Sequence, residues 1–113
     1  MRKIEEQMNQ AISNNETWQS GNTSVHYSAE YNSSTVYLHD NLIAIVYAND
    51  IEIFDGDHQT MTTKSRLNAI LQEHGIDGEK VFQKAGDWFI KQYNNLKKDW
   101  EVVPFKSGMV VGV

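Results

Sequence analysis

The sequence contains no cysteine, only one proline and no long apolar run. Without cysteine the chain has no disulfide scaffold, no thiolate zinc site and no cysteine nucleophile. No apolar run approaches the roughly 20 residues of a membrane-spanning helix. The N-terminus has no apolar signal-peptide core, so we expect a cytoplasmic protein that does not enter a membrane. The 113 residues, 40% hydrophobic and 11% aromatic, predict a single globular domain over 1–113.

Positive charge is also missing from half of the chain. No Lys or Arg lies between Lys3 and Lys64, whereas nine Asp and Glu residues do, and six of the ten basic residues follow Gly75. Binding to a nucleic-acid backbone requires several cations that neutralise phosphates together. The first half cannot supply that surface, so nucleic acid is an unlikely partner, although a basic edge on the second half stays open.

The hydrophobic pattern predicts an α+β fold. In residues 1–15, Ile4, Met8, Ala11 and Ile12 recur at helical spacing, which predicts an amphipathic N-terminal helix that must dock on the domain's own sheet or on a partner. Residues 18–55 are rich in β-branched and aromatic residues separated by turn signals, and we expect an antiparallel β-meander there. One central amphipathic helix follows at 62–74, and C-terminal strands at 79–113.

The strands predicted at 35–39 and 42–47 flank Asp40 and Asn41, two residues that tolerate positive φ and suit a two-residue hairpin turn. That turn would place Leu38 opposite Ile43 and Val36 opposite Ile45. Both faces of the hairpin are then largely apolar, so we expect both to be covered. Because the chain is short, part of that cover would come from a second copy, which predicts a homo-oligomer.

Residues 79–98 fit two patterns. One is a hairpin with a turn at Ala85, Gly86 and Asp87, and the other is a helix in which Gly86 would cost about 1 kcal/mol relative to alanine. The hairpin is favoured. Pro104 fits an edge strand because proline has no N–H to donate, and we expect residues 109–113 to form a last apolar strand or tail.

The central helix begins with hydroxyls and cations. Thr62 or Thr63 can cap it, but Lys64 and Arg66 lie where the helix dipole is positive and disfavours cations. Either these side chains extend into water, or they share a bound anion such as a phosphate with the free N–H groups. Trp18 or Tyr37 would provide a surface on which a base could stack. The candidate ligand-binding residues are Thr63, Lys64, Arg66, Asn68, Trp18, Asn22 and Tyr37.

Other chemistry is weakly indicated. Asp55, Asp57 and His58 form the densest acid–histidine cluster, but Ca²⁺ and Mg²⁺ sites usually need more oxygen ligands at fixed spacing, so a solvated turn explains it better. The chain has neither a nucleophile elbow nor a phosphate-binding glycine loop followed by lysine. We therefore expect a non-enzymatic protein with no cofactor and no metal.

Three segments resemble one known family: Ser-Gly-Asn-Thr at 20–23, Leu-His-Asp-Asn-Leu-Ile-Ala at 38–44, and Thr-Thr-Lys-Ser-Arg-Leu-Asn-Ala at 62–69. In this order they resemble a family of small conserved bacteriophage proteins, over residues 18 to about 110, with the N-terminal helix as an addition. The resemblance implies a phage accessory protein in the cytoplasm of a bacterial host, without a reaction or catalytic residues.

Two hypotheses about function follow. In the first, the protein is an anti-defence protein that binds and sequesters a small phosphorylated ligand, such as a nucleotide. In the second, the acidic half mimics nucleic acid or inhibits a basic host protein.

Overall fold

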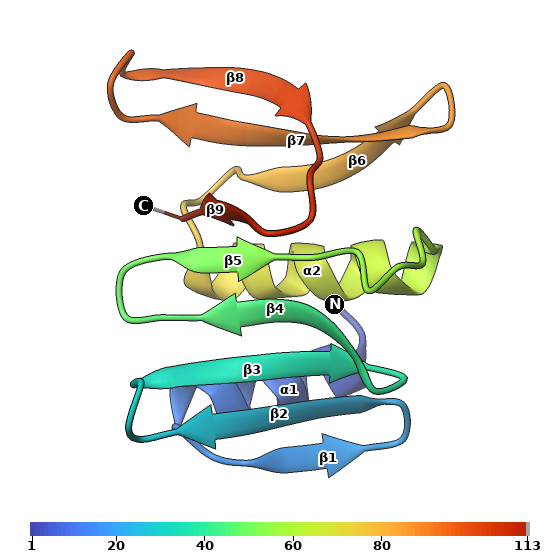
Figure 1. Ribbon diagram of the computed structural model, residues 1–113, viewed down its shortest axis with the longest axis vertical. Coiled ribbons are helices and arrows are strands. Elements are labelled where there is room, and N and C mark those ends of the chain that lie inside the picture. Colours follow the sequence, from blue (N-terminus) through green and yellow to red (C-terminus); the bar gives the residue numbers. More distant parts are fainter. Residues whose placement is uncertain (113) are drawn as a thin grey trace.

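The computed structural model describes residues 1–112 and confirms the α+β class (Figure 1). An N-terminal helix precedes a run of antiparallel strands, a central helix and a second group of strands. The elements are α1 (Lys3–Ser13), β1 (Trp18–Ser20), β2 (Thr23–Ser28), β3 (Ser33–Leu38), β4 (Asn41–Val46), β5 (Ile51–Ile53), α2 (Met61–His74), β6 (Lys80–Lys84), β7 (Asp87–Asn94), β8 (Asp99–Pro104) and β9 (Met109–Val111).

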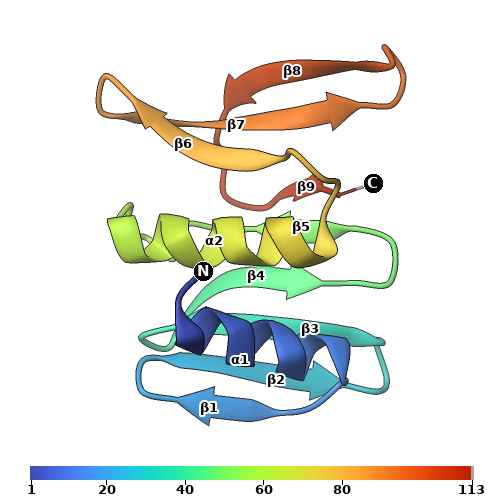
Figure 2. The ribbon, with the colours of Figure 1, turned by 180° about the vertical axis from the view of Figure 1, so that it is seen from behind.

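The strands form two antiparallel sheets. The first sheet has the order β1-β2-β3-β4-β5-β9, and the second has the order β6-β7-β8. Both helices lie on the same face of the first sheet (Figures 1 and 2). Over residues 1–112 no helix covers its other face, so the prediction that both faces are covered is not met within this chain.

The helices pack against each other as well as against strands. α1 contacts β1, β2 and α2, while α2 contacts β4 and β6. Met8, Leu67 and Ile70 are fully buried between these elements. The same hydrophobic cluster includes Val81 and Ile90 of the second sheet. The predicted apolar stripe of the N-terminal helix thus docks on the chain's own sheet and helix.

The predicted turn of the β3–β4 hairpin is wrong by one residue. His39 and Asp40 occupy the turn with φ of 50° and 64°, and Asn41 already pairs with Leu38 as the first residue of β4. Histidine, like Asp and Asn, is enriched in this left-handed region, so the turn is chemically reasonable. The N–H of His39 also donates to the carbonyl of Asn22 (2.8 Å), which joins this turn to the β1–β2 turn.

A β-bulge in this hairpin changes which side chains face the core. The register shifts between Val36 and Tyr37, so Val36 lies opposite Ala44 rather than the predicted Ile45. A bulge places two residues of one strand opposite one of the other. As a result both Ile43 and Ala44 are buried, where strict alternation would have exposed one of them.

The C-terminal predictions are largely confirmed. Residues 80–94 form the hairpin, with Ala85 and Gly86 at positive φ in its turn, and Pro104 ends the edge strand β8. The predicted strand at 109–113 exists as β9, although Val113 lies outside the described residues. After β8 the chain leaves the second sheet, and β9 pairs with β5 at the edge of the first sheet.

Candidate ligand-binding site

Helix α2 is capped by Thr60, not by the predicted Thr62 or Thr63. The hydroxyl of Thr60 accepts a hydrogen bond from the N–H of Thr63 (3.1 Å). The hydroxyl of Thr63 donates in turn to the carbonyl of His58 (3.2 Å) and lies 3.0 Å from the Thr60 hydroxyl. These contacts tie the β5–α2 loop to the first turn of the helix, and they use the Thr63 side chain internally.

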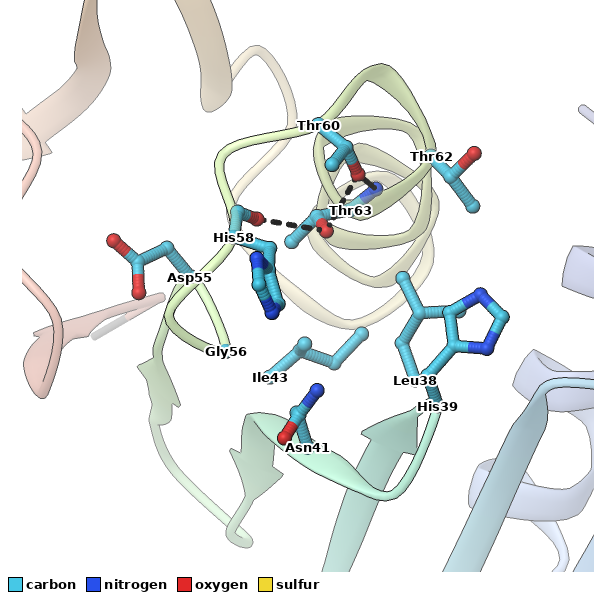
Figure 3. Close-up of a pocket in the computed structure, with 10 residues that line it drawn as sticks. All are labelled: Leu38, His39, Asn41, Ile43, Asp55, Gly56, His58, Thr60, Thr62 and Thr63. Carbon is cyan, nitrogen blue, oxygen red and sulfur yellow. Dashed lines mark hydrogen bonds between the residues drawn. The ribbon is translucent and has the colours of Figure 1, made fainter.

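A cavity of about 340 Å³ opens beside this helix start (Figure 3). Three segments surround it: the β3–β4 turn, the β5–α2 loop and the first turn of α2. The lining residues are Leu38, His39, Asn41, Ile43, Asp55, Gly56, His58, Thr60, Thr62 and Thr63. A ligand there would contact an apolar floor from the sheet and a polar rim from the loops.

Several polar groups of residues that line the cavity have no hydrogen-bond partner among residues 1–112. They are the side chains of His39, Asn41, His58 and Thr62 together with the N–H group of Thr62. The first N–H groups of any helix lack partners within it and carry its positive dipole. In Figure 3 the His58 imidazole points from its loop toward Ile43 and Asn41. The cavity therefore presents several groups able to donate hydrogen bonds.

Neither Lys nor Arg lines the cavity. Its one acid, Asp55, accepts hydrogen bonds from the N–H of Asp57 (2.8 Å) and from the Gln59 amide (3.3 Å). Lys64 instead reaches Gln83 of the second sheet (3.5 Å). Attraction of an anion would thus depend on the helix dipole and on neutral hydrogen-bond donors.

Sequence spacing left Arg66 either in water or beside a bound anion, but the residue is buried, with an exposed fraction of only 3%. Its Nη1 lies 2.8 Å from Glu5 Oε2, its Nε donates to the Thr23 hydroxyl (3.0 Å), and its Nη2 contacts Asn22 Oδ1 (3.4 Å). Ser65 also donates to Glu5 (2.6 Å). α1 and the first sheet cover the helix face that sequence spacing assigned to solvent, so Arg66 serves as an internal cross-link.

The carboxylate of Glu5 is held in its charged form by this network. Burial alone would raise the pKa of Glu5, but hydrogen bonds from Ser65, the N–H of Arg2 and Arg66, with the Arg66 charge, outweigh burial and lower its pKa. A buried charge is tolerated when it is paired and hydrogen-bonded. The Glu5–Arg66 pair is therefore part of the fold, and no atom of it faces the cavity described above.

The other predicted ligand residues are dispersed. Asn68 donates to the carbonyl of Val81 (2.9 Å) and accepts from its N–H (2.8 Å), which joins α2 to β6. Trp18 and Tyr37 do share a shallow hollow on β1–β3, together with Ser24 and His26, but it is separate from the cavity at the start of α2. Of the seven predicted residues, Thr63 alone lines that cavity.

Sequence reasoning missed His39, Asn41, Thr60 and Thr62 as cavity residues and considered His58 only for a metal. The available signal was the Leu-His-Asp-Asn turn, which the resemblance had singled out as a string without assigning it a site. Within residues 1–112 the structure brings no three His, Asp or Glu side chains together as metal ligands.

Comparisons with known proteins place the chain in a phage family. A family model described as Kyanoviridae Gp96 protein matches residues 1–112, whereas no curated protein and no solved structure matches. The match begins at residue 1, so the prediction that α1 is an addition to the family pattern is wrong. No helix within residues 1–112 has the length and apolarity needed to span a bilayer. The chain belongs to the Kyanoviridae Gp96 family of cyanophage proteins.

Proposed function

We propose that this phage protein binds a small phosphate-bearing ligand, such as a nucleotide, at the start of α2 without reacting with it. The observation that carries the proposal is the cavity of about 340 Å³ with unpaired donors on three of its sides. Helix N-termini bind anions through such N–H groups. In an infected cell, a protein that holds a nucleotide signal would withhold it from host defence.

The site we propose differs from the one predicted by sequence. Thr63 contributes by shaping the helix start, while Thr62, His39, His58 and Asn41 replace Lys64 and Arg66 as contacts to the ligand. Asp55 opposes an anion by charge repulsion. The dipole of α2 and the hydrogen-bond donors around the cavity must outweigh that repulsion for an anion to bind.

The test is isothermal calorimetry with inorganic phosphate and a panel of linear and cyclic nucleotides. His58→Ala should weaken binding by roughly tenfold, as expected for a lost hydrogen bond to a charged group. His26→Ala is the matched control, because His26 is exposed on β2 outside the cavity. Absence of binding by the wild-type protein, or equal losses in the two variants, would eliminate this site.

The acidic-mimic hypothesis remains the second candidate, and one observation favours it. Of the nine acids between Lys3 and Lys64, Glu5 alone takes part in an ion pair within residues 1–112. The remaining negative charge stays available to a basic host protein. Co-purification of a host protein that dissociates at raised salt, without any nucleotide effect on melting, would support the mimic over the ligand-binding protein.

Self-association also remains a proposal. α1 no longer argues for a partner, since the chain itself covers it, but the open face of the first sheet carries Tyr37, Leu42, Ile45 and the exposed Val110. A dimer would remove these side chains from water. Multi-angle light scattering should give a mass near twice 13.0 kDa, and a monomer mass at all micromolar concentrations would contradict this.

A further inference from the structure

The second sheet has one face that packs on the core and one that faces away from it. Val81, Ile90 and Val103 are paired across the three strands, and Val81 and Ile90 are fully buried. Because side chains alternate between faces along a strand, the neighbouring residues lie on the opposite, outer face. The outer face carries Lys80, Phe82, Lys84, Asp87, Phe89, Lys91, Tyr93, Trp100, Val102 and Pro104.

Four aromatic rings on this outer face form two clusters. Phe82 and Phe89 are stacked with centroids 5.9 Å apart, and Tyr93 meets Trp100 edge to face at 5.5 Å. Phe89 and Tyr93 are four residues apart on β7, which corresponds to about 13 Å along the strand. Trp100 is 37% exposed, and it lies against Gly78, where a Cβ would come within 2.9 Å of the ring. The aromatic row thus remains accessible instead of filling the core.

Lysines alternate with these rings. Lys91 lies between the two clusters on β7, with its Nζ 5.0 Å from the centroid of the Trp100 ring. Lys80 and Lys84 flank Phe82 on β6, and all three lysines are exposed. The single acid of the face, Asp87, lies opposite Lys84 in the strand register at the hairpin end. Residues 79–106 carry six lysines and four acids, so this part of the chain differs in sign from the acidic remainder.

We propose that the outer face of the second sheet binds single-stranded nucleic acid. Sheet aromatics stack on successive bases, and cations beside them neutralise the backbone phosphates; together these two features describe sequence-tolerant single-strand binding. The face offers no Ser, Thr, Asn or Gln side chain to select base edges or a ribose hydroxyl. DNA and RNA strands of the same sequence should therefore bind alike, and duplex DNA, whose bases are not available for stacking, should bind less well.

This proposal revises an expectation drawn from charge. The acidic first half made nucleic acid an unlikely partner, but a basic edge on the second half stayed open. The structure places three lysines and four aromatic rings of that half on one surface. A second copy of the chain is the alternative occupant. The alternation of ammonium groups with rings favours a polyanion with flat bases over another protein surface.

Fluorescence anisotropy of a labelled oligothymidine of about 15 nucleotides, titrated with the full-length chain, measures this binding directly. If three lysines contact phosphates, the slope of log K against log salt should be about −2. An RNA strand of the same length should match the DNA within a fewfold, and a duplex should bind at least tenfold more weakly. No binding at low salt, or a preference for duplex, would overturn the proposal.

Two pairs of variants locate the surface. Lys91→Glu should weaken oligothymidine binding by roughly tenfold, whereas Lys3→Glu, the same charge change at an exposed position of α1, should have a much smaller effect. Trp100→Leu should also lose roughly tenfold, while Tyr31→Leu, at an aromatic residue that is 71% exposed in the β2–β3 turn, should not. Equal losses within a pair would assign the face to another role. So would variants that lose a dimer by light scattering but still bind the oligonucleotide. Melting temperatures of all four variants identify any that fail to fold.

Discussion

The first sheet with its two helices and the second sheet of three strands stabilise themselves by different means. The first region buries an ion pair, Glu5–Arg66, within a network of hydroxyl and amide groups. The second region buries Val81, Trp88 and Ile90 and keeps its own ion pair, Lys97–Glu101 at 3.6 Å, at the surface. Removing one charge of the pair should therefore lower the free energy of unfolding strongly in the first region and hardly at all in the second.

The largest expected effect is that of Arg66→Ala. The substitution leaves the Glu5 carboxylate buried without its partner, which typically costs about 3–5 kcal/mol of unfolding free energy. Urea denaturation measures the loss. Lys97→Ala, which breaks the exposed pair, is the matched control and should cost less than about 1 kcal/mol. If the two substitutions cost the same, the distinction between the two regions is wrong.

A smaller effect is expected where the two regions meet. Asn68→Ala removes both side-chain hydrogen bonds to the backbone of buried Val81 and should cost about 1–3 kcal/mol. Amide exchange should accelerate in β6–β8 more than in β2–β4. Gln72→Ala, at an exposed position of the same helix, should leave both sheets unchanged. Uniform acceleration across the sheets would mean that they open as one unit.

The third prediction concerns the β3–β4 turn of the first region. Asp40→Val places a β-branched residue at a φ of 64° and should destabilise the protein by about 1 kcal/mol or more. Asn41→Val should be better tolerated, because Asn41 is already in β4. Thermal melting of the two variants distinguishes them, and the reverse order would restore the turn that the sequence predicted.

The smallest effect is expected from pH acting on the first region. Burial lowers the pKa of His74, against the opposing charge of Glu73, and its Nε2 is buried without a partner in the described chain. The unfolded chain then binds this proton more readily, so stability should fall as the pH drops below the usual histidine range. His74→Leu should flatten the stability curve between pH 7 and 5, and His26→Leu should not. Parallel curves for both variants would contradict this.

Local patterns predicted the elements well because they depend on neighbouring residues. The stripe of α1, the strands of 18–55, the helix over α2 and the glycine turn of the β6–β7 hairpin follow from periodicity and turn chemistry. The exact hairpin register did not, since the bulge beside Val36 depends on how Ile43 and Ala44 both reach the core. A single inserted residue of this kind leaves no signal in an alternating pattern.

The candidate site was harder to predict than the fold. Arg66 and Lys64 looked alike in sequence, yet one is buried against Glu5, 61 residues away, and the other extends toward the second sheet. Such contacts depend on tertiary packing, which spacing along one helix cannot provide. The charge asymmetry between the halves was visible, but its arrangement as a row of lysines and rings required the strand pairing of β6–β8.

The contact between Asn68 and Val81 has a consequence for self-association. In an antiparallel pair, the N–H and C=O of one residue point to the same side of the strand, and those of Val81 point away from β7 toward α2. The Asn68 amide therefore occupies the position where an added strand would bind and blocks the outer edge of β6. Free strand edges promote pairing with other chains. A strand from another copy could thus extend the second sheet only at β8. That edge strand ends in Pro104, which has no N–H to donate.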